Sequence, residues 1–145
     1  MREEKAQPCE LCASVAGELL WQDDLCRVVL VDDPDYPGLC RVIWAAHIRE
    51  MTDLSASERR HLMDVVFAVE NAVRLVLHPD KINLASLGNL VPHVHWHVIP
   101  RYRHDRHFPN PIWGQAQHDV QAEKPEDLAA SLRTVLHVAL RSHTA

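Results

Sequence analysis

The chain has 145 residues, of which 47% are hydrophobic, and this length fits one compact domain with a buried core but not two. A formal net charge of −5 at pH 7 provides no overall positive field that would attract nucleic acid or a membrane surface. No apolar run approaches the roughly 18–20 residues of a membrane-spanning helix, and the charged N-terminal segment lacks the apolar core of a signal peptide. We therefore expect a single cytosolic domain over residues 1–145, in which all four cysteines are reduced thiols.

The first half of the chain predicts a meander of antiparallel strands. Runs rich in β-branched and aromatic residues alternate with turn residues, and these runs lie at 18–24, 25–33 and 39–46. A tight turn at Gln22–Asp24 joins the first two runs, and a proline-rich turn ending at Gly38 interrupts the chain before the third.

One long helix follows the meander. Ser55 and Glu58 have the spacing of a capping box, and apolar residues recur at helical spacing until Pro79. The segment from Pro125 to residue 142 predicts a second, amphipathic helix, with the proline at a tolerated position in the first turn.

Two more strands lie between the helices, at 81–88 and 91–101. The connection from Gly88 to Pro92 is too short for a parallel crossover, so the two strands are expected to pair antiparallel. The predicted fold class is therefore α+β, with a five-stranded antiparallel sheet, one long helix and a C-terminal helix.

Three histidines occupy alternate positions in the stretch VPHVHWHVIPR, residues 91–101. On a strand, His93, His95 and His97 would share one face while the residues between them face a core. Lys, Thr or Glu would serve a solvent-facing strand better, so the triplet indicates a functional site.

Residues four apart on a strand are about 13 Å apart, whereas a metal–nitrogen bond measures about 2.0–2.1 Å. One ion could hold two neighbouring histidines but hardly all three, which leaves at least one imidazole for other chemistry.

Cys9 and Cys12 form a Cys-x-x-Cys pair near the N-terminus. In a cytosolic protein this spacing is typical of metal binding or of a redox motif, and no thioredoxin-like βαβ pattern surrounds it. Two thiolates need two further ligands to complete a tetrahedral zinc site. The pair therefore predicts a metal site, with two buried or idle thiols as the alternative. Cys26 and Cys40 lie in apolar strand segments and are expected in the core.

The pattern His-Val-His-Trp-His-Val-Ile, residues 93–99, resembles the signature of the histidine triad (HIT) family. The resemblance extends to the Cys-x-x-Cys pair, an Asp-rich proline turn between strands and a histidine before the long helix. It implies a HIT-like fold and a homodimeric nucleotide hydrolase or transferase, which attacks an α-phosphorus and forms a covalent nucleotidyl-histidine. Trp113, in the polar segment after the triad, is expected to pack against the dimer partner rather than to stack on a base.

The resemblance also implies roles for the histidines. His95 would be the nucleophile, which suits covalent catalysis because a neutral imidazole attacks phosphorus well. His97 would donate to a non-bridging phosphate oxygen. In the zinc-bearing bacterial branch of the family, a histidine before the helix and the first histidine of the triad complete a structural zinc site. The implied ligands are Cys9, Cys12, His47 and His93. Four protein ligands leave no open position for a water molecule, which argues against a metal-dependent hydrolase.

Several nucleotide contacts follow from the resemblance, although the chain departs from the common pattern. Leu39 stands where many members have the histidine of a Gly-His pair, so one phosphate contact is missing. Residues 88–91 read Gly-Asn-Leu-Val instead of Gly-Gln-Ser/Thr-Val, which keeps an amide donor at Asn89. Asp32 lies beside the position of the ribose-binding Asp, and Arg101 follows the triad, where it could meet a distal phosphate. The departures motivate an alternative function, a nucleotide-binding sensor with little turnover.

Overall fold

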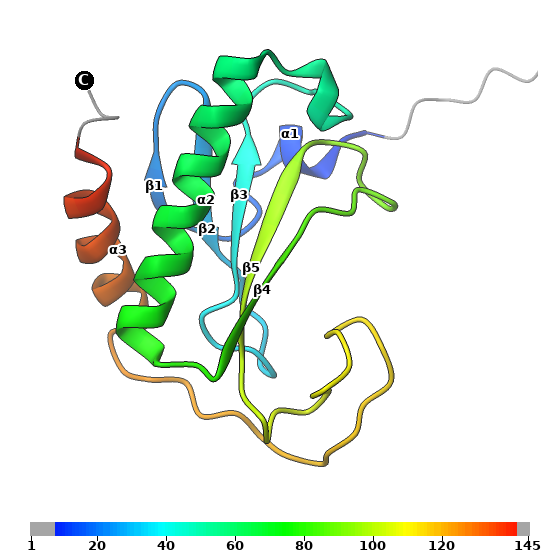
Figure 1. The fold of residues 1–145 in the computed structure, drawn as a ribbon, viewed down its shortest axis with the longest axis vertical. Coiled ribbons are helices and arrows are strands. Elements are labelled where there is room, and N and C mark those ends of the chain that lie inside the picture. Colours follow the sequence, from blue (N-terminus) through cyan, green and yellow to red (C-terminus); the bar gives the residue numbers. More distant parts are fainter. Residues whose placement is uncertain (1–7, 142–145) are drawn as a thin grey trace, which may run out of the picture.

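The computed structural model describes residues 8–141, and its strands form one antiparallel sheet in the order β1-β2-β3-β5-β4 (Figure 1). In chain order the elements are α1 (Glu10–Ala13), β1 (Glu18–Gln22), β2 (Cys26–Leu30), β3 (Cys40–Trp44), the 3₁₀ turn η1 (Met51–Asp53), α2 (Ala56–Leu77), β4 (Lys81–Ala85), β5 (His95–Arg101) and α3 (Leu128–Ala139). The predicted α+β fold class is confirmed. Within residues 8–141, no helix is long and apolar enough to cross a membrane.

Helices α2 and α3 cover one face of the sheet (Figure 1). The predicted capping box starts α2, because Glu58 N–H donates to Ser55 Oγ and Ser55 N–H donates to Glu58 Oε1. His78, in the left-handed region at φ 49°, ends the helix just before Pro79. The main core lies between the helices and the sheet and includes Leu62, Val65, Val69 and Val73 of α2 and Val28, Val42 and Val98 of the strands.

The opposite face of the sheet carries the histidines. Strand alternation directs the residues next to Val42 and Val98 away from α2. On this second face, His95 of β5 lies opposite Ile43 of β3, and His97 lies opposite Arg41.

The triad strand starts later than predicted, at His95 rather than residue 91. His93 N–H donates to the carbonyl of Val91 (2.8 Å) in a tight turn around Pro92, and a proline cannot donate to a strand ladder. His93 therefore precedes β5, and the strand itself carries only His95 and His97.

The C-terminal helix is also shorter than predicted. It begins at Leu128, after Asp127 in the left-handed region at φ 55°, so Pro125 precedes the helix instead of lying in its first turn. The short helix α1, which carries the Cys-x-x-Cys pair, was not predicted; a helix of four residues has no apolar periodicity to reveal it.

Candidate functional site

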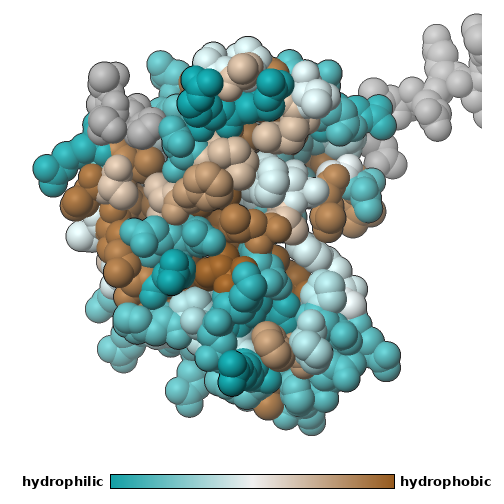
Figure 2. Space-filling model, in the orientation of Figure 1, coloured by the Kyte–Doolittle hydropathy of each residue, from teal (hydrophilic) through white to brown (hydrophobic). Residues whose placement is uncertain are grey.

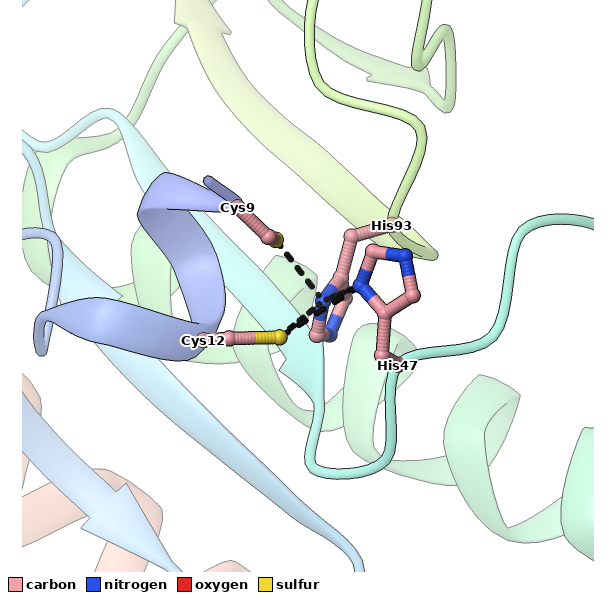
Figure 3. A group of neighbouring side chains, drawn as sticks. All are labelled: Cys9, Cys12, His47 and His93. Atoms are coloured by element: carbon pink, nitrogen blue, oxygen red, sulfur yellow. Dashed lines mark hydrogen bonds between the residues drawn. The ribbon is translucent and has the colours of Figure 1, made fainter. Parts of the chain in front are cut away.

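Cys9, Cys12, His47 and His93 come together from three parts of the chain (Figure 3). The cysteines lie at the start and within the short helix α1, His47 follows β3, and His93 precedes β5. The two sulfurs and the two Nδ1 atoms all lie within 4.8 Å of one another. Both sulfurs are 3.4 Å from Nδ1 of His93, and the two Nδ1 atoms are 3.3 Å apart. With zinc–nitrogen bonds of about 2.0–2.1 Å and zinc–sulfur bonds of about 2.3 Å, the ligand atoms of a tetrahedral ion are about 3.3–3.8 Å apart, so the cluster fits one such ion.

A backbone contact sets the tautomer of His93. Its Nε2 lies 2.6 Å from the carbonyl oxygen of Trp44, and a carbonyl only accepts hydrogen bonds, so Nε2 carries the proton. Burial lowers the pKa of His93, which favours the neutral ring. Nδ1 therefore presents a lone pair to the two thiols and to His47, which is the form of imidazole that binds a metal ion.

Arg27 of β2 holds the helix of the cysteines against the sheet. Its Nη2 donates to the carbonyls of Leu11 (2.8 Å) and Ser14 (3.0 Å), and its Nε donates to the carbonyl of Val15 (3.1 Å). A cation at these carbonyls offsets the partial negative charge where α1 ends. Sequence reasoning did not identify Arg27, because nothing local links it to a helix that lies more than ten residues earlier.

His95 has the opposite tautomer from His93. Its Nδ1 lies 2.6 Å from the carbonyl oxygen of His93, so Nδ1 carries the proton and donates. Nε2 consequently keeps its lone pair. Burial lowers the pKa of His95, which keeps the ring neutral near pH 7. Ser86, the residue after β4, donates from Oγ to the backbone carbonyl of His95 (2.7 Å). The side chain is thus prepared to act as a nucleophile at Nε2.

His97 lies beside His95, with ring centroids 5.0 Å apart. Burial lowers the pKa of His97 to about 4, and the charges of His95 and Arg41 act in the same direction. Its Nδ1 is buried and has no hydrogen-bond partner among the described residues. The ring also contacts Trp113 edge-on, at a centroid distance of 5.0 Å. Trp113, which is 50% exposed, therefore lies beside the histidines of its own chain; its predicted packing against a partner stays a prediction.

Asp32 and Asn89, two predicted nucleotide ligands, are exposed. Asp32 follows β2 and lines a surface hollow of about 550 Å³ together with Gly17, Leu30 and Gly38. Asn89 lies in the connection between β4 and β5 that leads to the triad. Both side chains are accessible to a ligand, and their binding of nucleotide stays a prediction.

Arg101, the third predicted nucleotide ligand, is buried in a polar network. Its guanidinium donates to both carboxylate oxygens of Asp105 (2.8 and 3.1 Å), to Asn83 Oδ1 (2.8 Å) and to the carbonyl of Asn110 (2.7 Å). Burial raises the pKa of Asp105, but the hydrogen bonds from Arg101 and from two backbone N–H groups outweigh it and hold the pKa at about 2. These contacts anchor the segment that carries Trp113. Binding of a phosphate by Arg101, which stays a prediction, would require them to open.

The family model of the HIT domain matches residues 14–104. This is more than half of the chain, and the chain therefore belongs to the HIT domain family. The match contains Arg27, His47 and the whole triad, whereas Cys9 and Cys12 lie just before it.

Solved structures of bacterial histidine triad proteins have the same fold. The chain superposes on the protein blr8122 of Bradyrhizobium japonicum with a TM-score of 0.71 and 27% identity, over 82% of this chain and 91% of that one. A Marinobacter aquaeolei protein gives a TM-score of 0.70 and 29% identity, over 94% and 96%. A Zn-bound family protein of Mycobacterium smegmatis gives 0.64 and 25% identity, over 93% and 96%.

A plant enzyme is also similar to this chain. The chain is 27% identical over 106 residues to the adenylylsulfatase HINT3 of Arabidopsis thaliana. The similarity covers 67% of this chain and 54% of the relative, so the chain spans about half the length of the curated protein that it matches.

Proposed function

We propose that this protein is a nucleotide hydrolase or transferase that cleaves at the α-phosphate of a dinucleoside polyphosphate or a nucleoside phosphoramidate through a covalent nucleotidyl-His95. The hydrogen bond from His95 Nδ1 to the carbonyl of His93 carries the proposal, because it leaves a neutral imidazole with its Nε2 lone pair free. Membership of the HIT domain family and the similarity to an adenylylsulfatase support chemistry at a nucleotide phosphorus.

The proposed reaction has two displacements. In the first, the Nε2 lone pair of His95 forms a bond to the α-phosphorus, and the leaving group departs with the electrons of its own bond and takes up a proton. In the second, water attacks the phosphorus, the nitrogen–phosphorus bond breaks, its electrons return to Nε2, and the proton of the water is released. His97, as a neutral imidazole with one N–H, donates to a non-bridging oxygen where negative charge accumulates.

We infer that the cluster of Cys9, Cys12, His47 and His93 binds a structural zinc ion. Two thiolates and two imidazoles are a typical ligand set for structural zinc, and the distances in the cluster suit tetrahedral geometry. The Zn-bound relative of M. smegmatis supports the choice of metal. With four protein ligands, the ion would contribute to folding, and it would hold His93, whose carbonyl orients the nucleophile.

A substrate panel tests the proposed activity. We expect the protein to release AMP from at least one of diadenosine tetraphosphate, adenosine phosphoramidate and adenylyl sulfate, which differ only in the group attached to the α-phosphate. Phosphorus NMR of each reaction identifies the products and the bond that breaks. Nucleotide binding without turnover on any of them would contradict the proposal and favour the nucleotide-binding sensor.

We also propose that the protein is a homodimer. Phe67 and Leu75 of α2 are 51% and 56% exposed, and apolar residues form a band across the face that the helices present (Figure 2). β4 is an edge strand of the sheet, with a row of backbone groups available for pairing. A two-fold pair would bury the same patch on both protomers. Sedimentation velocity at micromolar concentration is expected to show a dimer; a monomer at every concentration would contradict the proposal.

A further inference from the structure

Arg41 is a cation on the histidine face of the sheet, and the reaction described above assigns it no role. It lies in β3 directly opposite His97 of β5, while its neighbours Cys40 and Val42 pack in the core on the helix side. Cβ atoms of residues opposite each other in antiparallel strands are about 4.5–5.5 Å apart. The side chain of Arg41 therefore starts next to the imidazole of His97.

The guanidinium of Arg41 differs from those of other arginines that pack against the sheet in its partners among the described residues. Arg27 donates to carbonyls, Arg101 pairs with Asp105, and Arg133 pairs with Glu18. By contrast, within residues 8–141 Nε of Arg41 is buried without a hydrogen-bond partner, and no ion pair there includes this side chain.

The surroundings of Arg41 favour an anion. Arg41 is partly buried, and its charge contributes, after burial and His95, to the lowered pKa of His97. A partly buried cation without a counter-ion is costly, and an anion that pairs with it removes that cost. A planar guanidinium can also donate two parallel hydrogen bonds to two oxygens of one phosphate.

We propose that Arg41 binds the phosphoryl group that His95 attacks. The inference rests on the proposed function and adds Arg41 to the residues that contact the phosphate. The guanidinium donates to the non-bridging oxygens of the α-phosphate from the β3 side, while His97 approaches from β5. Arg41 forms no covalent bond; it neutralises the charge of the bound phosphate and the further charge that develops as the nucleophile adds.

Binding of AMP and of adenosine by the intact protein tests the inference, because the two probes differ by one phosphate. We expect Arg41→Met to weaken AMP binding by about 10- to 100-fold in calorimetry, the usual worth of a charge-assisted hydrogen bond, and to leave adenosine binding unchanged. Arg41→Lys keeps the charge but not the planar fork, and should recover part of the loss. The matched control is Arg74→Met, which removes one exposed positive charge from α2 on the other side of the sheet.

A second measurement uses the wild-type protein and depends on no variant. The Nε–H resonance of Arg41 in nitrogen-15 NMR should shift when AMP is added and should stay in place with adenosine. An unmoved resonance, or equal AMP affinity in wild type and Arg41→Met, would overturn the assignment of Arg41. Absence of a nucleotide adduct on His95 with every substrate of the panel would instead overturn the proposed function, and the binding measurements on Arg41 would remain valid.

Discussion

Replacing His95 with alanine is expected to lower the rate of nucleotide cleavage by more than about a thousandfold, as the loss of a covalent nucleophile does in other enzymes. Nε2 of His95 carries the available lone pair, because its Nδ1 is bound to the carbonyl of His93. Steady-state assays with the substrate identified in the panel measure the loss. Circular dichroism and AMP binding should show a folded protein that still binds nucleotide.

His97→Ala is the matched comparison, since the two imidazoles lie on the same strand face and each is 7% exposed. Loss of one donor to a phosphate oxygen should slow the reaction by roughly a hundredfold, and the covalent intermediate should still form. Quenching in alkali preserves nitrogen–phosphorus bonds, so mass spectrometry should find a nucleotide on His95 in the wild type and in His97→Ala. Full activity of His95→Ala, or an adduct on His93 or His97, would refute the assigned nucleophile.

Metal analysis of protein purified without chelator is expected to find one zinc ion per chain. Removing the ion, or changing Cys12 to alanine, should destabilise the protein by at least about 3 kcal/mol, because a closed tetrahedral site contributes its binding energy to folding. For a domain of this size that loss lowers the melting temperature by about 10 °C. At temperatures where the metal-free protein is still folded, its rate of nucleotide cleavage should change little, because the metal would not touch the phosphate.

The control for Cys12 is Glu10→Ala, an exposed change on the same short helix outside the cluster. Glu10→Ala should retain zinc and should melt near the wild-type temperature. A metal-free protein with unchanged melting temperature and full activity would disprove the zinc site.

The elements of the fold were predictable where local patterns are strong. The capping box of Ser55 and Glu58 and the apolar period that ends before Pro79 place α2 within a residue of its observed bounds. The predicted starts of β5 and α3 were less accurate, because each lies near a proline whose effect depends on the conformation of the neighbouring turn. Pro92 and the turn from Val91 to His93 delay β5, and Pro125 lies before α3 rather than inside it.

The sequence by itself determined the chemistry that is available, namely a Cys-x-x-Cys pair and three closely spaced histidines with a family signature. Only the tertiary structure decided how that chemistry is arranged. The contacts that join Cys9 and Cys12 to His93 span more than 80 residues, and the partner of Arg101 depends on how the chain turns back after β5. The register of β3 against β5 places Arg41 opposite His97. Such contacts follow from the packing of the whole sheet, which no local pattern of residues encodes. The tautomer of His95, set by the carbonyl of His93, has the same origin, because it depends on the turn that orients one peptide group toward one ring nitrogen.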